Sequence, residues 1–314
     1  MKVLTVDHPH SFKKEDFPPL VMALGYFDGI HLGHQKVIQT AKQIAEEKHL
    51  KSAVMTFDPH PSVVLAKNHK VVELITPLHE KIKLIESMGI DYLFVVHFTT
   101  DFASLLPQQF VDQYIVGLGV KHVVAGFDYT YGKFGKGNMN NIEEFANGRF
   151  DITVVDKLTL QNRDDKVSST LIRKCIKEGR VRDLKDLLGR YYEISGIVVH
   201  GEKRGRELGF PTANIELSDP YILPPNGVYI VRMYVRNQWH NGLCSVGYNP
   251  TFKNPDEYVQ TTEVYLLDFS DWIYDEHVIV EWHDRIRDEK KFNSVEDLIT
   301  EMKHDEQVAR NYFK

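Results

Sequence analysis

The sequence predicts two domains of different class, an α/β domain followed by an all-β domain. A length of 314 residues is enough for about two domains. Over the first part, short apolar runs alternate with segments of helical periodicity, which is typical of a doubly wound parallel sheet with helices on both faces. From Tyr191 onward, extended runs punctuated by Gly, Pro and Asn follow one another without a helix, which indicates an antiparallel barrel or sandwich. We place the boundary so that the domains are 1–187 and 188–314.

The front domain is expected to bind its ligand at one edge of its sheet. Ligands of such sheets bind beyond the carboxyl ends of the strands. The expected strands are 21–24, 52–57, 92–97, 122–125 and 152–155, and the expected helices are 34–48, 77–88, 107–117, 142–146, 169–178 and 181–188.

The rear domain is expected to contain six strands and a C-terminal helix. Ser294 predicts the N-cap of an amphipathic helix from 295 to about 302, and a last helical turn ends at Lys314. The expected strands are 192–199, 211–215, 227–235, 240–246, 261–268 and 277–284.

Composition argues against several classes of protein. The net charge of −6 gives no general nucleic-acid footprint, so we expect small-molecule partners and no nucleic acid. No apolar run approaches the ~20 residues needed to span a membrane, and the N-terminus lacks the pattern of a signal peptide. Cys175 and Cys244 lack metal-ligand spacing and are expected to be reduced thiols of a cytoplasmic protein. The oligomeric state stays open.

The most informative stretch is 25–34, G-Y-F-D-G-I-H-L-G-H, which leaves an apolar strand and opens a helix. The free N–H groups and positive dipole end of such a helix attract phosphate. His31 and His34 are three residues apart and lie on one face of the first turn, and Gly33 has no side chain to block a phosphate. Histidines at this spacing are more often surface or capping residues, but this context favours a triphosphate site. The same site is expected to include Gly25, Phe27 and Asp28.

A second phosphate-binding segment is expected at 168–173. Ser168 or Ser169 alone would be an ordinary helix N-cap. With Thr170 there are three consecutive hydroxyls, and Arg173 supplies a planar fork that fits two phosphate oxygens. We therefore expect this helix start to face the one at 31–34 and to hold the other end of a triphosphate.

Two loops that follow strands are weaker candidates. The segment 126–135 alternates aromatics with glycines, so it either walls a flat ring system near Asp128 or is an ordinary connecting loop. In the segment 57–61, Pro59 and Pro61 stiffen the chain. Its polar residues, Asp58 and His60, face either a ligand or solvent.

The rear domain opens with a glycine-punctuated basic loop at 201–215 that leads into a strand. Its glycines let backbone N–H groups converge on phosphate oxygens, and its basic side chains add attraction. Thr212 and Asn214 are two residues apart and share one face of that strand, where their oxygens suit Mg²⁺. The alternative is a surface hairpin, and the two interpretations are about even on these residues alone.

One carboxylate of the rear domain stands out. Alternation puts Glu263 on the same strand face as Tyr265 and Leu267, and a carboxylate on an apolar face usually has a charge partner, a metal or a catalytic task. The alternative is that this face is solvated. The charge-rich segment 285–292 would ordinarily be a solvated turn.

The front-domain motifs resemble those of a known enzyme family. G-x-F-D-G-x-H-x-G-H at 25–34 and S-S-T-x-I-R at 168–173 resemble the two signatures of the nucleotidyltransferase superfamily. With F-D-P-H-P at 57–61, they resemble the FMN adenylyltransferase domain of bacterial bifunctional riboflavin kinase/FAD synthetases. The resemblance implies that His31 and His34 stabilise the phosphorus of ATP under attack by FMN, with pyrophosphate leaving toward 168–173. It also implies that Asp58 and Asp128 lie in the flavin and nucleotide loops; Tyr26 stands where the family often has Asn.

The rear-domain motifs resemble the riboflavin kinase domain of the same family. The matches are G-R-x-L-G-F-P-T-A-N at 205–214, P-N-G-V-Y at 225–229, G-x-N-P-T-F at 247–252, E-V-Y-L-L-D-F at 263–269 and R-x-R-x-E-x-K-F at 285–292. The implied fold is a six-stranded antiparallel barrel with a terminal helix. Glu263 would be the base that deprotonates the riboflavin 5′-hydroxyl, and Tyr265 stands where the family often has His. The implied ATP and Mg²⁺ residues are Gly205, Arg206, Gly209, Thr212 and Asn214, and the implied flavin residues are Arg287 and Glu289.

We therefore expect an enzyme that phosphorylates riboflavin to FMN and adenylylates FMN to FAD, using ATP and Mg²⁺ in both steps. One alternative is narrower: a kinase alone, or an adenylyltransferase for another phosphate-bearing acceptor. The other is a flavin-binding regulator of a nucleic acid or protein, for which the sequence offers no basic face or added module.

Overall fold

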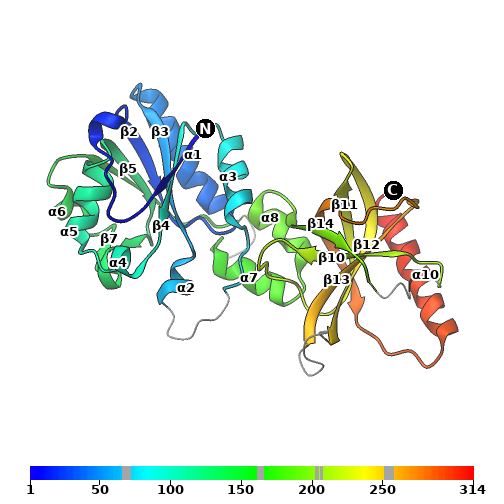
Figure 1. Ribbon diagram of the computed structural model, residues 1–314. Coiled ribbons are helices and arrows are strands. Elements are labelled where there is room, and N and C mark those ends of the chain that lie inside the picture. The colour runs from blue at the N-terminus through cyan, green and yellow to red at the C-terminus, as the bar shows by residue number, and fades with distance from the viewer. Residues whose placement is uncertain (66–71, 161–165, 202–204, 206–207, 251–257) are drawn as a thin grey trace. The chain divides into compact units, whose positions relative to one another are not determined.

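The computed structural model describes residues 1–314 except 66–71, 161–165, 202–204, 206–207 and 251–257 (Figure 1). The chain forms two compact units, Met1–Ser169 and Thr170–Lys314. Residues 170–187, which we predicted in the front domain, belong to the second unit. The compact units divide at 169/170, whereas the predicted boundary between the two functional domains lies at 187/188. The functional boundary stays a prediction.

The first unit is built on a six-stranded parallel sheet with the order β1-β4-β3-β2-β5-β8. All five predicted strands are present. The strand β1, which pairs with β4 at the edge of the sheet, was not predicted. The strands are β1 (Lys2–Val6), β2 (Leu20–Leu24), β3 (Lys51–Asp58), β4 (Tyr92–His97), β5 (Val120–Gly126) and β8 (Asp151–Val155).

Both faces of this sheet are buried, as expected of a doubly wound fold. Alternate residues of β2 enter two different cores: Met22 lies in one and Ala23 in the other. The second core also contains Val37 and Ala41 of the helix that follows β2. The helices of this unit are α1 (Leu32–Glu47), α2 (Pro61–Leu65), α3 (Leu78–Ser87), α4 (Thr100–Ala103), α5 (Pro107–Phe110) and α6 (Ile142–Ala146).

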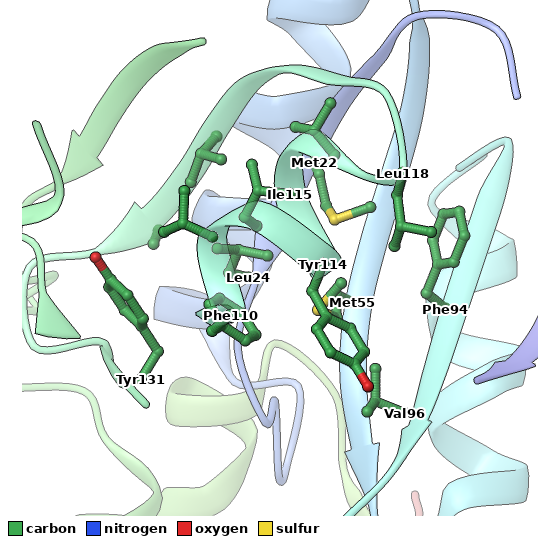
Figure 2. Packing of buried hydrophobic residues seen from close by; sticks show 14 of the residues in the cluster. Met22, Leu24, Met55, Phe94, Val96, Phe110, Tyr114, Ile115, Leu118 and Tyr131 are labelled. Atoms are coloured by element: carbon green, nitrogen blue, oxygen red, sulfur yellow. The ribbon is translucent and has the colours of Figure 1, made fainter. Parts of the chain in front are cut away.

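The predicted helix 107–117 is an α turn, α5, that continues as the π-helix η2 (Val111–Val116). Figure 2 shows Phe110, Tyr114 and Ile115 of this segment, and Leu118 just after it, packed with Met22 of β2 in the first core. Short pieces complete the unit: β6 (Thr130–Tyr131), β7 (Gly137–Asn138), and the 3₁₀ turns η1 (Lys14–Asp16) and η3 (Lys133–Gly135).

The second unit is a closed antiparallel barrel with the strand order β10-β13-β12-β11-β14-β9. Of the barrel and sandwich that the sequence allowed, the barrel is correct. Its strands are β9 (Tyr192–Val199), β10 (Thr212–Leu217), β11 (Gly227–Val235), β12 (Gln238–Pro250), β13 (Tyr258–Leu266) and β14 (His277–Asp288).

Helices flank the barrel in the chain on both sides. Before it come α7 (Ser169–Lys177), η4 (Val181–Asp183) and α8 (Leu184–Leu188). After it, α10 (Val295–Tyr312) is one continuous helix capped by Ser294, so the prediction of a break near 302 was wrong. Its inward face holds Ala309, which packs with Ile230 and Leu243 of the barrel.

Two further expectations concern the described residues alone. Cys175 and Cys244 are buried and form no disulfide with each other, in line with the predicted reduced thiols. Within the described ranges, no helix is long and apolar enough to cross a membrane.

Candidate active sites

The turn after β2 has a backbone that only certain residues can adopt. A Cβ on Gly25 would lie 2.7 Å from the Phe27 ring, and Phe27 itself has a φ of 57° and is buried. Gly29 has a φ of 89°, in the left-handed region that favours glycine. Gly25 and Phe27 thus shape the turn. Backbone conformations as unusual as that of Phe27 are concentrated at functional sites.

The two predicted histidines lie together at the start of α1. His31 is the N-cap, and its Nδ1 accepts a hydrogen bond of 3.1 Å from the His34 backbone N–H. The rings stack with centroids 3.5 Å apart and an interplanar angle of 20°. Because Nδ1 of His31 is an acceptor, neutral His31 carries its proton on Nε2 and can donate it to an oxygen. A Cβ on Gly33 would lie 3.1 Å from the His31 ring, so Gly33 leaves room for this imidazole.

The surroundings of His34 favour its neutral form. Burial lowers the pKa of His34 well below its usual value, and the charges of His31, Lys81 and Lys166 lower it further. The Phe27 ring meets the His34 ring edge-on at 5.3 Å. The Nδ1 of His34 is shielded from solvent and has no hydrogen-bond partner in the described part of the chain.

Lys81 on α3 is a buried cation next to this turn, and it was not predicted. Its Nζ donates to the Tyr26 carbonyl at 2.8 Å and to Thr56 Oγ1 at 3.3 Å, and lies 3.9 Å from the Tyr26 ring centroid. Burial lowers its pKa to about 8, although the charges of Asp28 and Asp58 oppose the shift. The available signal was its position on the apolar face of α3, four residues before Ile85.

Asp28 ties the turn to a distant segment. Its Oδ1 accepts hydrogen bonds of 3.1 Å from the backbone N–H groups of Ile75 and Thr76, and its carbonyl accepts one of 2.9 Å from Ser169 Oγ. The buried carboxylate thus has a clear structural task, which the phosphate-site interpretation did not include. The Ser169 contact also brings the start of the predicted second phosphate segment beside the first.

The other predicted residues of the front domain are placed as follows. Ser168 lies in the first unit, whereas Thr170 and Arg173, on α7, belong to the second. Asp128 pairs with Lys166, whose Nζ also lies 4.4 Å from the Phe127 ring centroid. Asp58 is exposed at the end of β3. That 168–173 holds the leaving phosphates stays a prediction.

In the second unit, two predicted residues of the kinase site make direct contact. Thr212 on β10 donates from Oγ1 to Glu263 Oε2 on β13 at 3.2 Å. The antiparallel register sets Asn214 opposite Glu263 and Thr212 opposite Tyr265. Glu263 forms no ion pair among the described residues.

A cavity of about 270 Å³ gathers the predicted flavin-side residues. Thr212, Glu263, Arg287 and Glu289 line it, with apolar side chains from the barrel and from α10. Glu289 Oε2 accepts a hydrogen bond of 2.9 Å from Asn226 Nδ2. A mostly apolar wall with a few converging polar groups is typical of a small-molecule site.

A second cavity, of about 250 Å³, is lined by Thr212 and Asn214 on one side and by Phe269, Trp272 and Tyr274 on another. Thr212 is a lining residue of both cavities. A Cβ on Gly201 would lie only 2.1 Å from Asn214 Nδ2, so this glycine lets the amide lie against the backbone.

The basic loop before β10 is only partly described. Arg206 lies outside the described residues, as do the last two residues of the predicted motif at 247–252. Gly209 has a φ of 84°, and a Cβ on Gly205 would lie 2.4 Å from the Phe210 carbonyl oxygen. Both glycines are therefore required by the backbone.

No three His, Cys, Asp or Glu side chains among the described residues are grouped as a metal site. The predicted Mg²⁺ oxygens, the Thr212 hydroxyl and the Asn214 amide, line the 250 Å³ cavity, and the Asp271 carboxylate lines it too. Two neutral protein oxygens fit Mg²⁺ that is held mainly by the phosphates of a nucleotide.

Comparison with known families agrees with this geometry. Residues 13–171 match the model of FAD synthetase, and residues 188–313 match the model of riboflavin kinase. The chain belongs to the bifunctional riboflavin kinase/FMN adenylyltransferase family. As a member of this family, it is an enzyme of FMN and FAD synthesis, with one activity in each half.

Relatives match over the whole length of the chain. The bifunctional riboflavin kinase/FMN adenylyltransferase of Bacillus subtilis is 52% identical, covering 100% of this chain and 98% of the relative. The protein of the same name from Listeria monocytogenes is 50% identical over the same shares. A solved structure from Streptococcus pneumoniae, titled a macrolide-efflux protein, is 35% identical with a TM-score of 0.88 and covers 99% of both chains. That title names a different activity for that protein, whose fold this chain shares.

Proposed function

We propose that the barrel transfers the γ-phosphoryl group of ATP to riboflavin with Glu263 as the base. Glu263 takes the proton of the 5′-hydroxyl, the hydroxyl oxygen attacks the γ-phosphorus, and ADP leaves while FMN forms. The observation that carries the proposal is the contact of Thr212, which lines both cavities, with Glu263, which lines the 270 Å³ cavity. One cavity would take the flavin and the other the nucleotide, with the transferred group between them.

We further propose that the front unit adenylylates FMN at the His31–His34 pair. An FMN phosphate oxygen attacks the α-phosphorus of ATP and pyrophosphate leaves. The Nε2–H of neutral His31 would donate to an oxygen on that phosphorus, where negative charge increases in the transition state. The N-terminus of α1 adds its unpaired N–H groups and dipole. Asp58 and Asp128 would border the flavin and nucleotide, and Ser168, Ser169, Thr170 and Arg173 would receive the pyrophosphate.

Mg²⁺ is proposed for both steps, with Thr212 and Asn214 as the protein oxygens nearest to it in the kinase. When bound, it would screen the triphosphate charge and orient the leaving group. The chain's own residues bind and align the nucleotide: Gly205 and Gly209 by an open backbone, and Arg206 by its charge.

The decisive experiment is a chromatographic assay of the purified protein with ATP and Mg²⁺, started once from riboflavin and once from FMN. The proposal expects FMN followed by FAD from riboflavin, and FAD from FMN. FMN without FAD from either start would contradict the front-unit proposal and favour the narrower kinase. Binding of flavin without any product would favour a flavin-binding regulator, and adding an RNA leader would then test that alternative.

A further inference from the structure

Two bidentate arginine–carboxylate pairs join α10 to the barrel. In one, Arg287 Nε lies 3.1 and 3.0 Å from the two carboxylate oxygens of Asp305, and its Nη2 lies 2.7 Å from Oδ2. In the other, Arg310 Nη1 and Nη2 each lie 2.8 Å from an oxygen of Asp268. The pairs differ in their surroundings: the Asp305 side chain is 3% exposed and the Asp268 side chain 75%.

The buried pair borders the 270 Å³ cavity, whereas Arg310 and Asp268 are not among its lining residues. Asp305 lies on the inward face of α10, four residues before the buried Ala309 and three after Met302, another residue of the cavity wall. A carboxylate on an apolar helix face is costly to bury, and an apolar residue there would stabilise the fold at least as well. Its position therefore needs a reason other than stability.

The contacts of Arg287 supply that reason. Asp305 accepts from Nε and from one N–H of Nη2, Glu301 Oε1 lies 3.4 Å from the same Nε, and the Asp288 carbonyl accepts from Nη1 at 3.1 Å. An arginine has five N–H donors, so one on each Nη remains for another partner. Glu263 and Glu289 line the same cavity, so an unrestrained Arg287 would have other carboxylates to approach.

We propose that Asp305 is a positioning residue of the kinase site: its carboxylate holds the Arg287 guanidinium in the one orientation that leaves two N–H donors for acceptor atoms of the flavin. Because Asp305 and Glu301 compensate the charge of the arginine, these donors suit the uncharged oxygens and ring nitrogens of riboflavin. The inference rests on the proposed flavin-binding role of this cavity.

The test is Asp305→Asn, assayed with varied riboflavin and varied ATP. An asparagine amide has one acceptor oxygen, so the two-point hold is lost. We expect the KM for riboflavin to rise about 10-fold, with the KM for ATP and the FMN-to-FAD rate unchanged. In an Arg287→Met background, Asp305→Asn should add no further rise, because it acts through that arginine.

Asp268→Asn is the matched control: it breaks a bidentate pair on the same helix away from the cavity, and riboflavin KM should stay unchanged. An unchanged KM in Asp305→Asn, an equal rise in both backgrounds, or an equal rise in Asp268→Asn would overturn the proposal.

KM does not depend on the folded fraction of the enzyme, so a partly unfolded variant can still be compared with the wild type. If Asp305→Asn does not fold, Asp305→Glu, which keeps the charge but shifts the guanidinium, should raise riboflavin KM by a smaller factor, and an unchanged KM would overturn the proposal. If the wild type makes no FMN, the proposed function itself fails, and riboflavin binding measured by fluorescence quenching in the same variants still tests Asp305.

Discussion

The imidazole of His31 lies flat on that of His34, 3.5 Å between centroids, while its Nδ1 accepts the His34 backbone N–H. The contact fixes which nitrogen of neutral His31 can donate and also satisfies one of the orphan N–H groups of α1. One side chain thus caps the helix and presents a donor at the helix end that attracts phosphate.

These two tasks can be separated by substitution. His31→Ala should remove the cap and the donor, whereas His31→Asn keeps a capping side chain and loses the imidazole. We expect both to reduce FMN-to-FAD conversion by at least about 100-fold, because a donor to the transition state is missing. Conversion of riboflavin to FMN, measured in the same samples, should be unchanged. Loss of both activities in His31→Asn would contradict the assignment of one activity to each unit.

Glu263→Gln gives the complementary result. Glutamine keeps an oxygen near Thr212 but cannot accept the 5′-hydroxyl proton as a carboxylate does. FMN formation should fall by about 100- to 10,000-fold, the range for a lost general base, while FAD formation from FMN continues. Thr262→Val, next to Glu263 on β13 and in the lining of neither cavity, is the control for damage to the strand and should retain the kinase activity. Equal loss in both variants would show that Glu263 acts through the fold.

The sequence was sufficient to predict the strands and helices whose apolar residues recur at regular spacing. It was also sufficient to predict sites that lie at a glycine-containing turn. Five of the six sheet strands and the closed barrel followed from such patterns, whereas the edge strand β1 did not. Lys81 and Asp305 were missed for a common reason: each is a charged residue on an apolar helix face. In the sequence, each appears only as a charged residue that interrupts the regular spacing of apolar residues. The partner of Lys81, Tyr26, is 55 residues away, and the partner of Asp305, Arg287, is 18 residues away.

The buried Lys81 should leave a signature in the pH dependence of stability. Its pKa is lowered from 10.5 to about 8 in the folded chain, so between these values the unfolded chain binds more protons. The free energy of unfolding of the first unit should therefore rise with pH across that window, by at most about 3 kcal/mol, and fall again as pH drops toward 8. Lys81→Met should lack this rise.

The measurement is pulse proteolysis in urea at several pH values, following fragments of the first unit in wild type and Lys81→Met. The tryptophans Trp239, Trp272 and Trp282 all lie in the second unit, so their fluorescence reports its unfolding separately. Comparing the two proteins cancels the other groups that titrate in this range. If the free energy of unfolding of the first unit changes with pH in the same way in wild type and in Lys81→Met, the pKa of Lys81 is not lowered by burial.

A substitution at Gly201 should change the kinase activity although none of the proposed Mg²⁺ or ATP ligands is itself replaced. A Cβ there would lie 2.1 Å from Asn214 Nδ2, closer than any such contact allows, so Gly201→Ala must displace the amide. Asn214 lines the 250 Å³ cavity, and with its oxygen displaced we expect the Mg²⁺ and ATP concentrations for half-maximal FMN formation to rise about 10-fold. In an Asn214→Ala background the clash is absent, so Gly201→Ala should then have no further effect. A loss of equal size in both backgrounds would instead point to the backbone at 201, and full activity of Gly201→Ala would remove Asn214 from the metal and nucleotide site.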